Sequence, residues 1–280
     1  MSGLSFSVLG TSQVAALGTA SFLSFSSTQI AGMSSAQVGV LSTAQIRVLG
    51  SAQVGALTTA AVEGFTTAQI GVLVSAQIQG FLGGQISALT QGQVAAFSTG
   101  AVRGFGSGQI GALSTAGAAG LTSAVVGTLN SRQVAGFGTA QVAVLSSAQV
   151  GVLTTAGVAG LASGQVGAFS VEAAPGLATG QVRVLSSAQV GALGTGVVDV
   201  LGTSQIGALS TAGLAGLGSA QLGVLTSGDV QGLTTGQVVA LSGGQLSALT
   251  TSAVLGLGTG LVRVLGSGQV SALGTSQVDA

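Results

Sequence analysis

Large apolar residues recur along this chain with a period of eight. From Leu9 to Leu273, all 34 positions spaced eight residues apart are Leu, Phe or Met, without an insertion or deletion. Three residues before each stands a Val, Ile, Leu or Phe, and only Ala118 and Ala174 are smaller. An unbroken short period is typical of a repeat array in which each unit packs on its neighbours. We therefore predict a single continuous octapeptide-repeat solenoid over residues 1–280, with no linker or domain boundary.

The consensus octad is [Gly/Ser/Thr]-[Ser/Thr]-[Ala/Gly]-Gln-[Val/Ile]-x-[Ala/Gly/Val]-Leu, and residues 146–153 show it well. Its two large side chains are three apart, which places them on one face of a helix but on opposite faces of a strand. Ser146 followed by Gln149 has the spacing of a capping box, and Leu145 with Val150 has that of a hydrophobic staple. We predict an all-α fold, in which each octad forms one very short capped helix of a solenoid.

A β-solenoid is the alternative fold. Val and Thr are abundant, and apolar residues alternate at the third, fifth and seventh positions. Gly is frequent at the sixth and seventh positions, where it costs about 0.5–1 kcal/mol in a helix interior. A helix of one and a half turns is also too short to be stable alone. Stability must therefore come from the caps, from stacking on neighbouring octads and from contacts between chains.

A longer period is visible where the octad departs from its consensus. Many replacements of Gln are five or seven octads apart, which a turn of about 2.4 octads, or about 19 residues, would generate. With that turn, most replacements share one sector, and the charged residues of the sixth position occupy an adjoining one. We expect one charged edge and a wider Gln-bearing surface. The replaced positions are Ser5, Ser21, Ala61, Ala101, Gly117, Val125, Gly157, Ala173, Val197, Gly213, Asp229, Ala253 and Leu261.

The composition excludes most active-site chemistry. The chain has no Cys, His, Trp, Tyr or Lys, and its five Arg balance five Asp and Glu. Thiolate metal sites and the usual general base are therefore absent, and five scattered Arg cannot form a phosphate-binding surface. We predict that the protein is not an enzyme, that it has no catalytic, cofactor-binding or metal site, and that it binds neither nucleic acid nor a small-molecule substrate.

Four features of the sequence are candidate sites. Glu63 with Asp199, or Glu172 with Asp229, would be a carboxylate pair, but the register places all four at scattered, solvated positions. The Gly-rich segments 258–260 and 266–268 lack the preceding strand and the Lys of a phosphate-binding loop.

The other two features are the Phe residues and the Gln row. Phe25, Phe65 and Phe105 replace Leu at the octad end, so we expect core residues rather than a ligand platform. The Gln row is interpreted either as helix caps or as hydrogen-bonded ladders between coils or between chains.

Hydropathy does not indicate a membrane span. The mean hydropathy is +0.78, but polar residues or Gly interrupt every apolar stretch well before the roughly 20 residues that a spanning helix needs. The N-terminal residues have no basic residue and no continuous apolar core, so we expect no classical signal peptide.

Two octads resemble repeats of a known kind. Residues 42–49 (Ser-Thr-Ala-Gln-Ile-Arg-Val-Leu) and 66–73 (Thr-Thr-Ala-Gln-Ile-Gly-Val-Leu) resemble tandem repeats of large bacterial proteins that are labelled as cell-surface, adhesin-like repeat proteins. The resemblance implies a bacterial origin and an extracellular or cell-surface location.

The expected surface is neutral and made of small side chains, which suits close packing against other copies of the chain. We expect a structural protein whose partner is itself, and which self-assembles into an extracellular filament, sheath or surface layer. The alternative is an adhesin stalk or an ice-binding module that uses rows of Thr.

Overall fold

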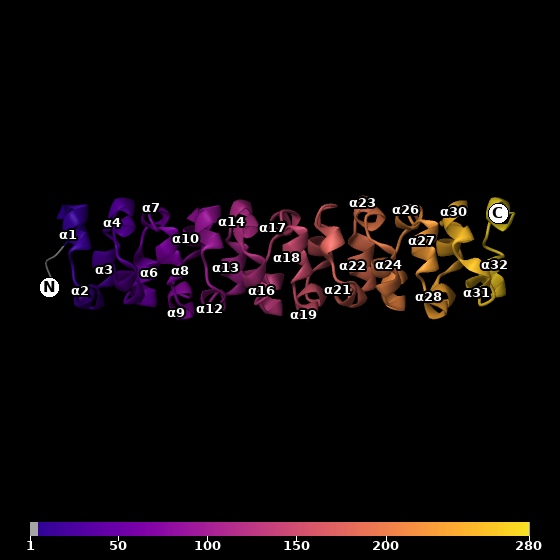
Figure 1. Ribbon diagram of the computed structural model, residues 1–280, viewed down its shortest axis with the longest axis horizontal. Coiled ribbons are helices and arrows are strands. Elements are labelled where there is room, and N and C mark those ends of the chain that lie inside the picture. Colours follow the sequence, from indigo (N-terminus) through magenta and orange to yellow (C-terminus); the bar gives the residue numbers. More distant parts are fainter. Residues whose placement is uncertain (1–4, 280) are drawn as a thin grey trace. The chain divides into compact units, whose positions relative to one another are not determined.

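The computed structural model describes residues 5–279 (Figure 1). These residues form thirty-three α-helices of four to six residues and two 3-10 helices, and they contain no strand. The predicted all-α solenoid of short helices is confirmed, and the β-solenoid alternative is wrong.

The chain divides into two compact units, Met1–Val144 and Leu145–Ala280. That residues 1–280 form one continuous solenoid stays a prediction. The helices of the first unit are η1 (Phe6–Val8), α1 (Thr11–Ala15), α2 (Thr19–Ser24), α3 (Ser27–Ile30), α4 (Ser35–Gly39), α5 (Thr43–Arg47), α6 (Ser51–Ala56), α7 (Thr59–Glu63), α8 (Thr67–Gly71), α9 (Ser75–Ile78), α10 (Gly83–Ala88), α11 (Gln91–Ala95), α12 (Thr99–Val102), α13 (Ser107–Gly111), α14 (Thr115–Gly120), α15 (Ser123–Val126), α16 (Ser131–Ala135) and α17 (Thr139–Ala143).

The second unit has the same kind of helix throughout, with one 3-10 helix among them. Its helices are α18 (Ser147–Gly151), α19 (Thr155–Ala159), α20 (Ser163–Val166), η2 (Ala174–Gly176), α21 (Thr179–Arg183), α22 (Ser187–Ala192), α23 (Thr195–Asp199), α24 (Thr203–Ala208), α25 (Thr211–Leu214), α26 (Ser219–Leu222), α27 (Ser227–Gln231), α28 (Thr235–Ala240), α29 (Gly243–Ser247), α30 (Thr251–Leu255), α31 (Gly258–Val262), α32 (Ser267–Val270) and α33 (Thr275–Val278).

The predicted capping box explains why each helix begins where it does. At α18 the hydroxyl oxygen of Ser146 accepts a hydrogen bond from the Gln149 backbone N–H (3.3 Å). The Gln149 Oε1 accepts one from the Ser146 backbone N–H (2.8 Å). Where Gly occupies the cap, Gln supplies its half alone, as when Gln53 Oε1 accepts from the Gly50 N–H (2.8 Å). These bonds satisfy N–H groups that the first turn of a helix leaves free.

The fifth and eighth positions of the octads form the core of each unit. In the first unit Ile70 and Leu73 are buried, and in the second Val150 and Leu153 are buried. Because the two positions are three apart on one helical face, every helix turns both side chains inward. The hydrophobic pattern of the sequence therefore predicts the core directly.

Neighbouring turns are related by three to four octads. Within the first unit α4 packs against α7 and α11 against α14, and within the second α24 packs against α27, always three octads apart. Side-chain hydrogen bonds of Gln reach back to the fourth preceding octad, as from Gln77 to Ile46 and Leu49. One turn therefore contains about 24 to 32 residues, and the predicted turn of 2.4 octads is wrong.

Glycine at the seventh position lets the turns approach closely. A Cβ on Gly64 would lie well under 3.0 Å from the carbonyl oxygen of Ser35, and a Cβ on Gly80 would be equally close to that of Ser51. No side chain fits at such a distance without a backbone shift. The helix-weakening Gly residues of the consensus are therefore used, at these sites, for contact between turns.

Two octads of the second unit depart from the common geometry. Residues 170–177 form a turn and η2 in place of an α-helix, and Pro175 of this octad has no backbone N–H to donate. Residues 258–265 have Leu261 in place of Gln, and α31 begins without a side-chain cap. Its first residue, Gly258, has a φ of 59°, the one positive φ among residues 5–279.

Candidate functional surface

The Gln side chains, expected on the surface, lie between turns. Gln77 is 2% exposed and Gln181 is 2% exposed. The Nε2 of Gln77 donates to the carbonyl oxygens of Ile46 (2.7 Å) and Leu49 (2.9 Å), while its Oε1 accepts from the Val74 N–H (3.0 Å). Both interpretations of the row are therefore correct for the same side chain, which caps its own helix and ties it to the preceding turn.

Because the Gln row is buried, its replacements do not mark a side of the molecule. The predicted Gln-bearing surface is wrong. Ser21 and Ala61, two of the replaced positions, are five octads apart. Ser21 lies in α2 and Ala61 in α7, and these helices are on opposite sides of the first unit (Figure 1). The predicted single sector is therefore wrong as well.

The outer surface is made by the first three positions of the octad and by the sixth and seventh. In residues 66–73, Thr66, Thr67, Ala68 and Gly71 are exposed and Val72 is half-buried. Along the chain these positions are mostly Ser, Thr, Gly and Ala. Some seventh positions add apolar area, and Val40, Val144, Val152 and Val184 are each about 40% exposed. The surface is therefore small, neutral and partly apolar.

Nine of the ten charged residues are exposed, and they form no ion pair in the part of the chain that the structure describes. The exception, Asp229, is buried, and its Oδ2 accepts from the Thr226 N–H (2.9 Å) in place of a Gln. The exposed residues are Arg47, Glu63, Arg103, Arg132, Glu172, Arg183, Asp199, Arg263 and Asp279.

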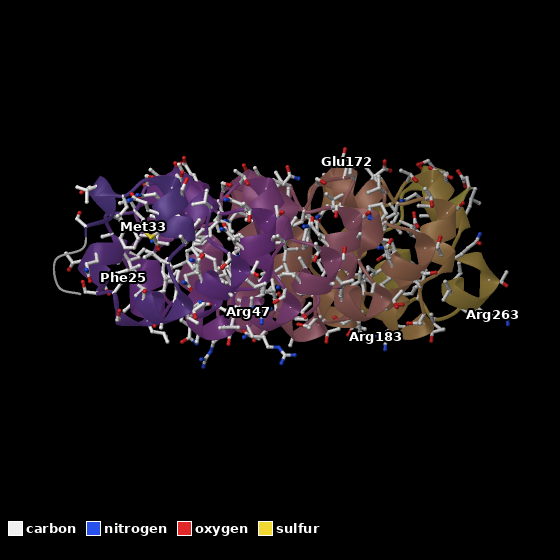
Figure 2. The ribbon with its side chains drawn as sticks, turned by 60° about the vertical axis from the view of Figure 1, so that its left-hand side comes forward. Phe25, Met33, Arg47, Glu172, Arg183 and Arg263 are labelled. Carbon is white, nitrogen blue, oxygen red and sulfur yellow. The ribbon has the colours of Figure 1, made fainter. Side chains whose placement is uncertain are left out.

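The sixth-position charges lie on more than one edge, so the predicted single charged edge is wrong. In the first unit α7 and α12 lie on opposite sides (Figure 1); α7 ends at Glu63, and Arg103 is the C-cap of α12. In the second unit α21 and α23 also lie on opposite sides (Figure 1); α21 ends at Arg183 and α23 at Asp199. Figure 2 shows Glu172, a third-position residue, on the edge opposite Arg183 and Arg263.

The carboxylates are placed as caps or as solvated groups. The Asp229 carboxylate caps the start of α27, whereas Glu172 is fully exposed. Hydrogen bonds from its own backbone N–H and from the Ser170 side chain lower the pKa of Glu172. Glu63, at the end of α7, and Asp199, at the end of α23, are both exposed. In neither imagined pair are both carboxyl groups buried.

The remaining candidates lie in the repeat itself. The Gly-rich segments 258–260 and 266–268 form the starts of α31 and α32, and no strand precedes them in residues 5–279. Phe25, Phe65 and Phe105 are each 4% exposed and pack in the core, as when the Phe105 ring contacts Phe97 edge-on (5.3 Å between centroids). No group of three or more acidic residues in the described part of the chain is placed to hold a metal ion. That the protein is not an enzyme stays a prediction.

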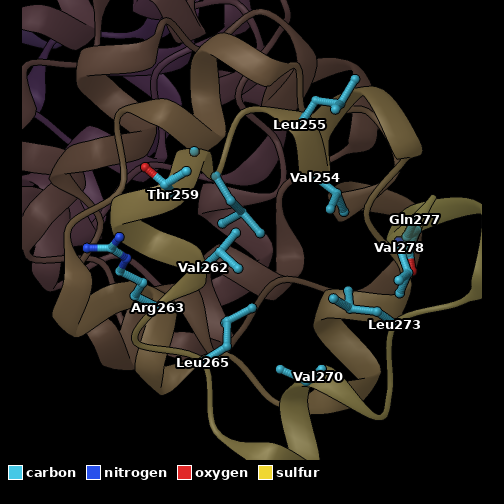
Figure 3. Close-up of a pocket in the computed structure, with 12 residues that line it drawn as sticks. Val254, Leu255, Thr259, Val262, Arg263, Leu265, Val270, Leu273, Gln277 and Val278 are labelled. Atoms are coloured by element: carbon cyan, nitrogen blue, oxygen red, sulfur yellow. The ribbon is translucent and has the colours of Figure 1, made fainter. Parts of the chain in front are cut away.

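A largely apolar cavity of about 520 Å³ lies among α30, α31, α32 and α33 (Figure 3). Its wall includes the fifth-position residues Val262, Val270 and Val278, which are 47–63% exposed. Their equivalents elsewhere are buried, as Val238 is. No later turn among the described residues covers these side chains, so the cavity is an uncovered part of the core row.

Within residues 5–279, no helix has the length and apolar character needed to cross a membrane.

Comparison with known families gives one finding. A model of the ALTTAQ repeat matches overlapping segments that together include more than half of the chain. No curated protein matches the sequence. The matched segments are residues 6–43, 22–51, 39–64, 49–82, 86–123, 123–155 and 198–235.

Proposed function

Because this chain belongs to the ALTTAQ repeat family, we propose that its short capped helices build a structural protein that self-assembles. Copies of the chain associate into a filament, sheath or surface layer outside the cell. The observation that carries the proposal is the outer surface, where Ser, Thr, Gly and Ala predominate and only nine residues of 280 are exposed charges.

The physical argument concerns the cost of bringing two such surfaces together. Small side chains lose little rotamer entropy in a contact, and they permit close approach of two backbones. A net charge of zero removes the repulsion that keeps most proteins apart at high concentration. Exposed valines such as Val144 and Val184 add apolar area to be buried.

An extracellular location is part of the proposal. Its support is the resemblance of octads such as 66–73 to repeats of bacterial cell-surface proteins. An array of repeats also suits a material outside the cell, where contact between copies is the function rather than turnover of a substrate.

Negative-stain electron microscopy and sedimentation velocity of the purified chain test the proposal. We expect ordered filaments or layers whose amount rises steeply with concentration. A chain that stays monomeric at the highest attainable concentration would contradict it. Single rods that bind a surface through one end would instead favour an adhesin stalk. Inhibition of ice recrystallisation would favour an ice-binding module.

A further inference from the structure

We propose that copies of this chain associate side by side, with an arginine edge on the second unit of one copy against a carboxylate edge on the second unit of the next. The inference rests on the proposed self-assembly and names the surfaces that carry it. The arginine edge is Arg183 and Arg263. The carboxylate edge is Asp199 and Asp279.

The two arginines lie on one side of the second unit. Arg183 and Arg263 are both sixth-position residues, and they are ten octads apart. Ten octads are three turns of about 3.3 octads each, which agrees with the three to four octads that relate neighbouring turns. Figure 2 shows Arg183 and Arg263 projecting from the same edge.

The carboxylates are displaced by about half a turn. Asp199 and Asp279 each follow an arginine of the same octad position by two octads. Two octads are one half to two thirds of a turn, which leads to the other side. In Figure 1, α21 and α23 lie on opposite sides of the second unit; α21 ends at Arg183 and α23 at Asp199.

The partner that fits these edges is a second copy in parallel orientation. The arginines Arg183 and Arg263 are ten octads apart, and so are the carboxylates Asp199 and Asp279. A single axial stagger of about half a turn therefore brings Arg183 and Arg263 of one copy opposite Asp199 and Asp279 of the next.

The arrangement of the edges determines the kind of assembly. None of these side chains is used in an ion pair within the part of its own chain that the structure describes. Because the two complementary edges lie on opposite sides, each copy can contact one neighbour on either side. Such a contact is heterologous and does not close, so it extends into a layer rather than stopping at a dimer. The charges set orientation and stagger, and the small neutral residues between them supply the contact area.

Reversing the charges of one edge at a time tests the inference. One variant carries Arg183→Glu and Arg263→Glu, and a second carries Asp199→Arg and Asp279→Arg. Each variant alone has two edges of the same sign, so we expect the concentration at which half the protein pellets to rise by about tenfold or more. An equimolar mixture of the two should restore the layers, because edges of opposite sign are again available.

Two controls separate edge pairing from net charge and from misfolding. The variant that combines both sets has exchanged edges and a net charge of zero, and it should assemble like the natural chain. Arg132→Glu changes a charge outside the arginine edge and should leave assembly unchanged. Circular dichroism shows whether each variant remains helical; all the substituted residues are exposed.

The outcomes distinguish the two proposals. If the natural chain assembles but the single-edge variants assemble equally well, or their mixture does not recover, edge pairing is wrong and self-assembly stands. If the natural chain forms no assembly at all, the proposed function fails and the inference fails with it.

Discussion

Two adjacent octads hold the preceding turn in different ways. Residues 58–65 and 66–73 both bury their fifth and eighth side chains. In the second octad, Gln69 Nε2 donates to the carbonyl oxygens of Val38 (2.8 Å) and Leu41 (2.7 Å). The first octad has Ala61 in place of Gln, and there the backbone of Gly64 lies directly against Ser35. The core row is thus common to both octads, whereas the link between turns is not.

The two links alternate along the sequence. Of the thirteen octads without Gln, eight have Gly at the seventh position, whereas only three of the twenty-one with Gln do. A turn can therefore be joined to the previous one either by a side-chain amide or by close backbone approach. The three octads that have both, such as 74–81, show that the links are compatible.

Preventing the close contact between the backbones of Gly64 and Ser35 should cause the largest loss in the free energy of unfolding. In the Gly64→Ala variant the added Cβ overlaps the Ser35 carbonyl oxygen, so the two turns must separate. We expect a loss of about 3 kcal/mol in the free energy of unfolding. Because repeat arrays need not unfold in one step, native-state hydrogen exchange in residues 34–41 and 58–65 should accompany denaturant unfolding.

The matched control is another glycine-to-alanine change in the same unit. A Cβ on Gly92, within α11, would meet nothing within 4 Å. Gly92→Ala should stabilise the chain by about 0.5–1 kcal/mol, because alanine is the better helix former. Equal effects of the two substitutions would show that Gly64 is not needed for contact between turns.

Removing the amide link should have the next largest effect. The Gln69→Ala variant leaves the buried carbonyls of Val38 and Leu41 without their donor and also loses half of the cap at Thr66. We expect a loss of about 2 kcal/mol, with faster hydrogen exchange in both octads concerned.

Gln13 provides the comparison, because its Oε1 caps Gly10 (2.8 Å) and its Nε2 reaches no earlier turn among the described residues. Gln13→Ala should therefore cost only a cap, about 0.5–1 kcal/mol. If Gln69→Ala and Gln13→Ala lower the free energy of unfolding equally, the hydrogen bonds from Gln to the preceding turn do not contribute to stability. Octads with and without Gln would then not differ in how strongly they hold the preceding turn.

The sequence predicts the helix of each octad well because its signals are local. Ser146 and Gln149 form the predicted cap, and positions five and eight form the predicted core. The pattern predicts the role of Gln only in part, since a cap and a ladder are not alternatives for an amide that has both an acceptor and donors. The predicted single charged edge is wrong because it depends on a turn of 2.4 octads.

A better signal for the turn was present in the sequence. Ser at the second position of an octad pairs with Gly at the seventh position of the third octad after it, as in Ser35 with Gly64 and Ser51 with Gly80. These pairs lie in contact across one turn, so their spacing reports the turn length directly. The spacing of Gln replacements does not report the turn length, because the buried hydrogen bond between turns can be absent on any side of the solenoid.

The smallest change in the free energy of unfolding is expected at Asp229, whose octad combines features of both classes. This octad has the seventh-position Gly232 and an acid that caps like Gln, since Asp229 Oδ2 accepts from the Thr226 N–H (2.9 Å). An ionised carboxylate has no hydrogen to donate to the carbonyl oxygens of Val198 and Leu201, which occupy the places where other octads have the acceptors of Gln.

Asp229→Gln should add the missing link and raise the free energy of unfolding by about 1 kcal/mol. Asp229→Asn is the control, because its shorter amide keeps the cap acceptor but falls short of the preceding turn. Slower hydrogen exchange in residues 194–201 should appear with Gln and not with Asn. If the two amides stabilise equally, the gain comes from removing a buried charge, and the amide link adds nothing where glycine already joins the turns.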